Sequence, residues 1–186
     1  MLTNRLIILI TTSFSLFGIF PSLIYCWKKN QLDAKKHTLS DCGSRDSKIM
    51  FNLSLALFAL LQTGLSTALT KELAHTKPNL IIAPISAGLL LFLAAIINNQ
   101  RKFIHRFFAS LAVLTSFFWI LALQMIIFYD LPRFTLISFT LLISLAISTI
   151  FTTKKYGVCL IPELVILGGI FTLDVLFSAT TLFYLS

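Results

Sequence analysis

Charged residues are scarce in this sequence, and their scarcity excludes most soluble proteins. Only 12% of the 186 residues are Asp, Glu, Lys or Arg, whereas soluble domains carry about a quarter. The hydrophobic fraction is 57%, and the mean hydropathy is +0.90. All but two of the 22 charged residues lie between long apolar runs rather than inside them. This composition excludes a soluble enzyme and predicts an integral membrane protein.

Glycine and cysteine are also few. Seven Gly residues exclude a collagen-like chain, and the abundance of Phe, Leu and Ile excludes a disordered one. Three cysteines are an odd number and do not predict a disulfide framework. The basic loops have no interleaved aromatic residues for base stacking, so the net charge of +8 does not predict nucleic-acid binding. That charge is instead consistent with loops that lie against anionic lipid head groups.

The apolar runs are long enough to cross a membrane as helices. A hydrocarbon core of about 30 Å takes roughly 20 apolar helical residues to cross. Continuous apolar runs indicate helices, because strands in a membrane barrel alternate between apolar and polar residues. The sequence therefore predicts one all-α domain over residues 1–186, a six-helix transmembrane bundle with spans near 6–27, 49–70, 80–98, 107–128, 134–152 and 161–184. The first span is expected to be retained, because no small-residue cleavage site follows it.

The distribution of positive charge predicts an orientation. The first, third and fifth loops hold eleven of the fifteen Lys and Arg residues. Loops rich in Lys and Arg stay in the cytoplasm. The charge distribution therefore predicts that these three loops are cytoplasmic and that both termini lie outside.

Asp174 lies inside the last predicted span, where a carboxylate is unusual. An ionised carboxylate in lipid costs several kcal/mol unless it is protonated, hydrated or paired, so we expect Asp174 to face the bundle interior. One hypothesis is a proton or cation pathway, and the other is a protonated Asp174 that bonds a neighbouring helix through Gln62 or Gln124. Small polar residues at every fourth position also predict a helix-contact face on the fifth span: Thr140, Ser144 and Ser148.

The first, third and fifth loops share one membrane face, and most of the chain's reactive side chains lie there. His105 with Asp41 or Glu163 is a candidate pair for general acid–base catalysis. The chain has no paired histidines at i and i+4, no Cys-x-x-Cys and no nucleophile elbow, so it predicts no metal site or cofactor and favours a protein that is not an enzyme. The structural alternative is a tight turn at Ser40, Asp41 and Gly43, in which Asp41 accepts backbone N–H bonds.

The segment Thr38-Leu39-Ser40-Asp41-Cys42-Gly43, with Phe51-Asn52 opening the second span, resembles a motif of an uncharacterised family of bacterial six-span membrane proteins. That family also has a His at the start of the fourth span and an Ala four residues later, which His105 and Ala109 match. It is similar in turn to the eukaryotic superfamily of damage-regulated autophagy modulators, Sfk proteins and Frag-type factors. In that superfamily an acidic residue opens the last span, as Glu163 does here. Cys42 replaces the usual Leu or Thr, the preceding proline is missing, and no tryptophan follows Glu163.

The resemblance implies a protein of lipid handling or membrane organisation, with no established cofactor. It also implies the orientation opposite to the one that the charges predict, with the first loop outside. Cys42 and Cys159 would then face an oxidising compartment, where they could form a disulfide, whereas in the cytoplasm they would stay reduced.

Residues and resemblance together predict a lipid-interacting or accessory membrane protein. Its head-group site is expected at the face of loops one, three and five, formed by Ser40, Asp41, Gly43, His105 and Glu163. Two alternative functions stay open: a small proton- or cation-coupled transporter or channel that uses Asp174, and an interfacial lipid hydrolase or transferase that uses His105 with Asp41 or Glu163. The predicted partners are membrane lipids, and also other membrane proteins or a second copy of the chain.

Overall fold

Helices account for nearly all of the regular structure in the computed structural model, which describes residues 2–14, 20–38, 41, 48–74, 77–97, 102–128, 131–157 and 159–183. Within these ranges there is no β-strand, so the predicted all-α class is confirmed. The elements are α1 (Leu2–Phe14), α2 (Phe20–Lys29), α3 (Lys48–Leu73), the short 3-10 helix η3 (Pro78–Ile81), α4 (Ile82–Ile96), α5 (Lys102–Ile127), α6 (Pro132–Tyr156) and α7 (Leu160–Phe183).

Five helical segments are long and apolar enough to cross a membrane. They are Lys48–Leu73, Asn79–Ile96, Phe103–Ile127, Pro132–Tyr156 and Ile161–Leu182. These segments coincide with the second to sixth predicted spans. The chain is therefore consistent with a multi-pass membrane protein whose spans are helical.

Helices α1 and α2 cover the described part of the first predicted span, near 6–27, and residues 15–19 between them lie outside the described residues. Helix α1 has 13 residues and α2 has 10, so at 1.5 Å per residue each is shorter than the hydrocarbon core. Pro21 has no backbone N–H, and inside a helix a proline ring clashes with the carbonyl four residues earlier. Such a residue fits the first turn of α2, where it lies, better than the middle of one continuous helix.

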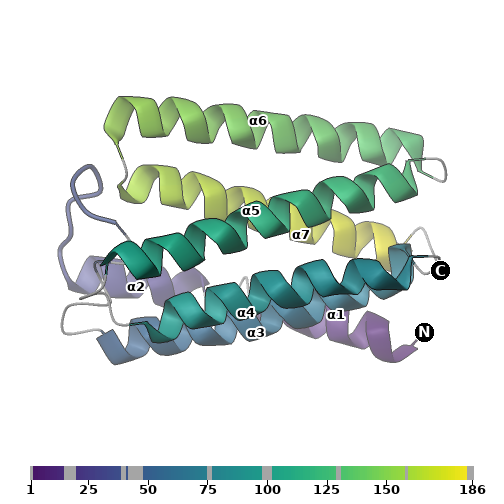
Figure 1. Ribbon diagram of the computed structural model, residues 1–186, viewed down its shortest axis with the longest axis horizontal. Coiled ribbons are helices and arrows are strands. Elements are labelled where there is room, and N and C mark those ends of the chain that lie inside the picture. The colour runs from purple at the N-terminus through teal and green to yellow at the C-terminus, as the bar shows by residue number, and fades with distance from the viewer. Residues whose placement is uncertain are drawn as a thin grey trace.

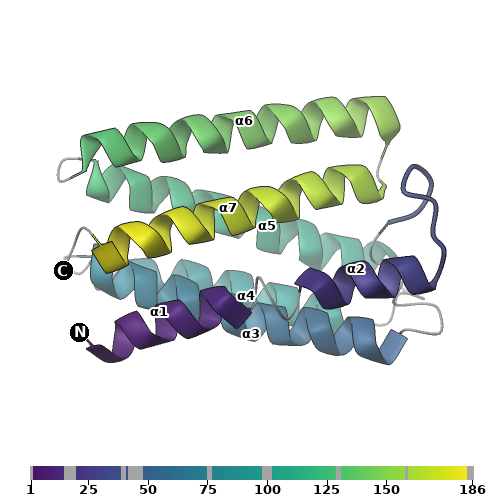
Figure 2. The same cartoon turned by 180° about the vertical axis from the view of Figure 1, so that it is seen from behind.

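The helices lie alongside one another in an up-and-down arrangement (Figures 1 and 2). Helix α4 packs between α3 and α5, while α7 contacts α1, α3 and α6. Helix α6 lies at the edge of the bundle, against α7 and α5 (Figure 1). The C-terminal ends of α2, α4 and α6 lie at one end of the bundle, with the starts of α3, α5 and α7. Loops one, three and five therefore connect helices at a common end, as predicted.

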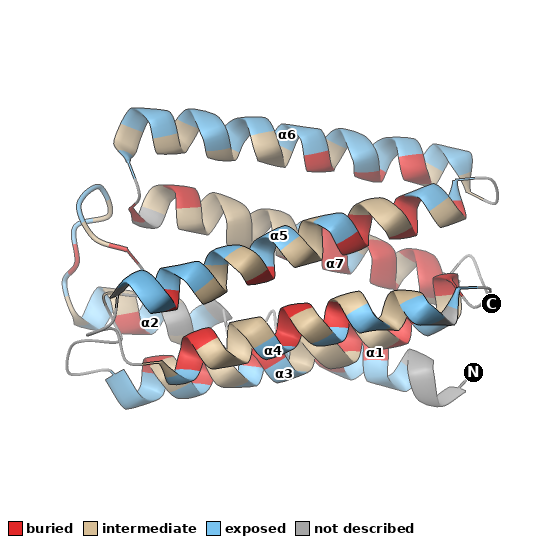
Figure 3. Ribbon diagram, viewed as in Figure 1, coloured by how far each residue is buried: buried red, intermediate tan, exposed pale blue. Residues whose placement is uncertain are grey.

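The outer surface of α6 is exposed along its length (Figure 3). Thr140, Ser144 and Ser148 lie on this exposed side, whereas the buried residues of α6 are Thr135, Ser138 and Leu142. The prediction that Thr140, Ser144 and Ser148 form a helix-contact face is therefore wrong for this bundle. The Thr140 hydroxyl donates to the carbonyl of Leu136 at 2.8 Å, so its polar group is satisfied within its own helix.

Two clusters of buried apolar residues form the core. One includes Ile8, Leu65, Trp119, Leu123 and Phe177, and the other is formed by Cys26, Leu32, Phe51, Phe58 and Phe171. Asp174 follows Phe171 and precedes Phe177 on α7. The buried carboxyl group therefore lies where the two apolar clusters meet.

Candidate functional site

Asp41 holds a tight turn in the connection between α2 and α3. Its Oδ2 accepts the backbone N–H of Thr38 at 2.8 Å, and its own N–H donates to the Thr38 carbonyl at 3.1 Å. The main-chain bond closes the turn, and the side-chain bond ties the Asp41 carboxylate back to its first residue. This geometry agrees with the structural alternative for Asp41, that its carboxylate accepts a backbone N–H. Ser40 and Gly43 lie outside the described residues.

His105 lies on the first turns of α5 and points into the bundle, with only 8% of its surface exposed. Its Nδ1 lies 2.8 Å from the carbonyl oxygen of Ala94. A carbonyl oxygen only accepts hydrogen bonds, so the Nδ1–H of His105 is the donor. The ring nitrogen Nδ1 therefore carries a proton. Ala94 is in the last turn of α4, where carbonyls have no partner within the helix. His105 therefore caps the C-terminal end of α4.

We expect His105→Ala to lower the stability of the protein, because it leaves the buried Ala94 carbonyl without a donor. An unsatisfied buried acceptor costs about 1–3 kcal/mol. His105→Asn should cost less, since the Asn side-chain amide carries an N–H near the position of Nδ1. Thermal unfolding in detergent tests this order, and equal stability of His105→Ala and the unmodified chain would contradict the capping role.

Glu163 occupies the first turn of α7 and is half-buried. A carboxylate at this place complements the positive end of the helix dipole. Asp41, His105 and Glu163 thus lie at the same end of the bundle. For acid–base chemistry, His105 has only Nε2 to exchange a proton, because its Nδ1 is bonded to the main chain.

A protein metal site takes several His, Cys, Asp or Glu side chains in one place. Within the part of the chain that the structure describes, no three His, Cys, Asp or Glu side chains lie close enough together to hold a metal ion. Cys159 is buried directly before α7. Its pairing with Cys42 stays a prediction, because Cys42 lies outside the described residues.

Asp174 is buried in the bundle interior, with 7% of its surface exposed. Gln62 on α3 donates from Nε2 to Asp174 Oδ1 at 3.0 Å. Of the two glutamines considered as partners, Gln62 is therefore the one bonded to Asp174. Gln124 is also buried, but it donates to the hydroxyl of Ser138 on α6 at 3.1 Å. The Gln62 to Asp174 bond joins α3 to α7 across the interior.

Two acceptor atoms of this interior pair remain without a hydrogen-bond partner. They are Oδ2 of Asp174 and Oε1 of Gln62, and both are buried. Each side chain lines a cavity of about 110 Å³ among α3, α4, α5 and α7. Thr63, which also lines it, donates its hydroxyl to the carbonyl of Ala59 at 2.7 Å. This is a buried polar site with unused acceptors.

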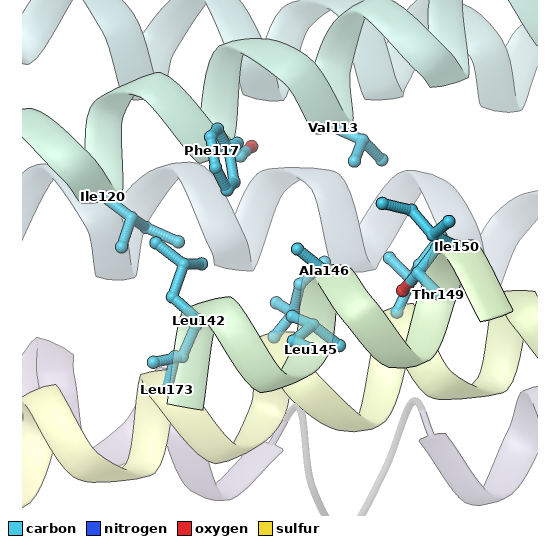
Figure 4. A pocket seen from close by; sticks show the side chains of 12 residues that line it. Val113, Phe117, Ile120, Leu142, Leu145, Ala146, Thr149, Ile150 and Leu173 are labelled. Atoms are coloured by element: carbon cyan, nitrogen blue, oxygen red, sulfur yellow. The ribbon is translucent and has the colours of Figure 1, made fainter. Parts of the chain in front are cut away.

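A second cavity, of about 270 Å³, lies among α5, α6 and α7 and is almost entirely apolar. Figure 4 shows its side chains converging from α5, including Phe117 and Ile120, and from α6, including Leu142 and Ala146. We call it the apolar groove. It shares several lining residues with the Asp174 cavity: Val113, Ser116, Ile120, Ile166 and Ile170. The two spaces are therefore adjacent, with side chains of α5 and α7 common to both walls.

Sequence reasoning missed several parts of this interior. Trp119 donates its indole N–H to the Thr70 hydroxyl at 2.9 Å, and Thr12 shares a 3.0 Å hydrogen bond with Ser178. Thr70 follows Ser66 by four residues and Ser178 follows Asp174 by four, and this helical spacing is the signal that could have found them. Trp119 gave none, because one Trp in an apolar span is ordinary.

Comparison with known proteins leaves the resemblance as a prediction. No family model, curated protein or solved structure matches this chain.

Proposed function

We propose that this protein is an integral membrane protein that binds anionic lipid head groups at the end of the bundle where α2, α4 and α6 terminate, here called the basic end. The observation that supports the proposal is the distribution of exposed cations among the described residues. The basic end carries eight of them: Lys28, Lys29, Lys35, Lys36, Lys48, Arg106, Lys154 and Lys155. The opposite end carries three: Lys71, Lys77 and Arg133. Each cation near an anionic surface contributes about 1 kcal/mol of attraction.

The predicted head-group residues complement these cations. A lipid phosphate is held by Lys and Arg, whereas Asp41 and Glu163 are acceptors for head-group hydroxyls. We propose Ser40, Asp41, Gly43 and Glu163 as the polar rim of the site, while the buried His105 acts on it through the end of α4 that it caps. Phosphatidylglycerol combines a phosphate with free hydroxyls, so it is the natural probe for this arrangement.

We expect removal of charge at the basic end to release phosphatidylglycerol. The fourfold variant Lys28→Gln, Lys29→Gln, Lys154→Gln and Lys155→Gln should bind this lipid at least about tenfold more weakly, a loss of about 1.4 kcal/mol. Native mass spectrometry of protein from mixed phosphatidylglycerol and phosphatidylcholine measures the retained lipid. The matched control is Lys71→Gln, Lys77→Gln and Arg133→Gln at the opposite end. Equal losses in both variants would refute a head-group site at the basic end.

In the proposed arrangement the chain crosses the membrane six times, and the basic end lies in the cytoplasm. The support for six crossings is that α1 and α2 follow one another along α3 (Figure 2), so that together they extend along most of the bundle. The cytoplasmic placement rests on the excess of Lys and Arg. It is the opposite of the placement that the family resemblance implies.

Labelling of Cys42 tests the orientation. We expect Cys42 in intact cells to react with a membrane-permeant maleimide and not with an impermeant one, because the loop between α2 and α3 belongs to the basic end. Cys26 and Cys159 are buried, and Cys42→Ser gives the background from them. Labelling by the impermeant reagent would place the basic end outside and favour the orientation of the similar family.

A further inference from the structure

The Asp174 cavity is built to accept hydrogen bonds. Asp174 Oδ2 and Gln62 Oε1 are both buried acceptors without a partner, and both residues line the cavity. Buried polar atoms are nearly always bonded, so this pair calls for a donor, which is either the proton of a neutral Asp174 or a group of a bound ligand. Among the described residues that line this cavity there is no Lys, Arg or His, and its side-chain donors are uncharged: the hydroxyls of Thr63, Ser66 and Ser116 and the indole of Trp119. A ligand that completes the site therefore carries hydrogen-bond donors and, to complement a carboxylate, positive charge.

The position of Asp174 decides how such a ligand reaches it. Asp174 lies fourteen residues after the start of α7, which is about 21 Å along the helix at 1.5 Å per residue. Much of the cavity wall is apolar, including Leu55, Phe58, Leu91 and Leu167. A ligand that entered from the end of the bundle would have to travel this distance along α7. The apolar groove adjoins the cavity and is lined by α5 and α6, so it offers another approach, from the surrounding lipid.

The groove fits a hydrocarbon chain. Its α6 wall extends from Leu142 to Ile150, about 12 Å along the helix, and its α7 wall from Ile166 to Leu173. Ile120 of α5 and Ile170 of α7 line both the groove and the Asp174 cavity, so the two spaces adjoin along these side chains. We propose that Asp174 and Gln62 bind the ammonium group of a lipophilic amine whose apolar chain lies in the groove among α5, α6 and α7. This site is separate from the basic end and does not depend on the proposed head-group binding.

The test measures binding of radiolabelled decylamine to the full-length protein in phosphatidylcholine nanodiscs, with empty nanodiscs subtracted. The expected result is saturable binding that unlabelled decylamine displaces. Asp174→Asn should weaken it at least about tenfold, while Asn still accepts the Gln62 amide, so the contact between α3 and α7 is kept. Unchanged affinity in Asp174→Asn would overturn the proposal.

A matched pair of variants on α6 tests the groove. Ala146→Phe fills it and should reduce decylamine binding, whereas Ile147→Phe changes a neighbouring side chain that is 61% exposed and does not line it. Equal effects of these two variants would overturn the lateral route.

Competing ligands test the chemistry of the head. Decanol has a donor without charge, decyltrimethylammonium has positive charge without an N–H donor, and decanoate has a negative charge and no donor. Each should displace decylamine at least about tenfold less effectively than decylamine itself. Displacement by decanol as strong as by decylamine would overturn the assignment to amines.

Discussion

Replacing Gly88 with alanine is expected to destabilise the bundle, because it overpacks the contact between α3 and α4. A Cβ at Gly88 would overlap the side chain of Thr63 on α3, with the Thr63 Cβ only 2.9 Å away. Rotation about χ1 moves the Thr63 hydroxyl but leaves its Cβ in place, so α3 and α4 must separate. Overpacking of this kind costs about 1–3 kcal/mol. The free energy of unfolding in detergent, measured for Gly88→Ala and the unmodified chain, checks it.

Gly168 provides the matched control. It is also helical, but a Cβ there would meet no atom within 4 Å. Gly168→Ala should therefore be neutral or stabilising by up to about 1 kcal/mol, because alanine favours helix over glycine. Thr63→Ala should rescue Gly88→Ala only in part, since it removes the hydroxyl and keeps the Cβ. If the two Gly→Ala variants were equally stable, the close contact between α3 and α4 would be refuted.

The spans were predictable because they depend on composition alone. Long apolar runs need no knowledge of their neighbours to be identified as membrane helices, and five of the six appear with bounds near those expected. Pro21 in the first run lies in the first turn of α2, a placement that the local effect of proline on a helix makes readable in the sequence. Hydropathy alone treats that run as uniform and does not register the residue.

The sequence predicted the orientation of an interior side chain only where exposure to lipid was too costly for that side chain. Asp174 had to face inward, and Ser178, four residues later, lies on the same side of α7. The choice of Gln62 over Gln124 depended on which helices pack together, which the sequence does not contain. The outward placement of Thr140, Ser144 and Ser148 also depends on how the helices pack. Helix α6 lies at the edge of the bundle and buries only one narrow face.

Gln62 and Asp174 should behave as a coupled pair when each is replaced by leucine. Gln62→Leu removes the donor to a buried carboxyl group, and Asp174→Leu leaves a buried amide unbonded. Each single variant is expected to lose about 1–3 kcal/mol of unfolding free energy, because a polar group remains without its partner. In the double variant both polar groups are gone, and two apolar side chains replace them between two apolar clusters. The double variant should therefore be more stable than either single variant.

This comparison separates what holds the bundle together from what the interior site does. An interhelical hydrogen bond in a membrane contributes about 0.6 kcal/mol on average and up to about 1.7, so the bundle does not require this one. A stable double variant that no longer binds decylamine would mean that the carboxyl group serves ligand binding rather than packing. Losses in the double variant equal to the sum of the two single losses would show that the residues act independently, and would contradict the contact between α3 and α7. Unfolding in detergent and binding in nanodiscs, measured on the same three variants, give both results.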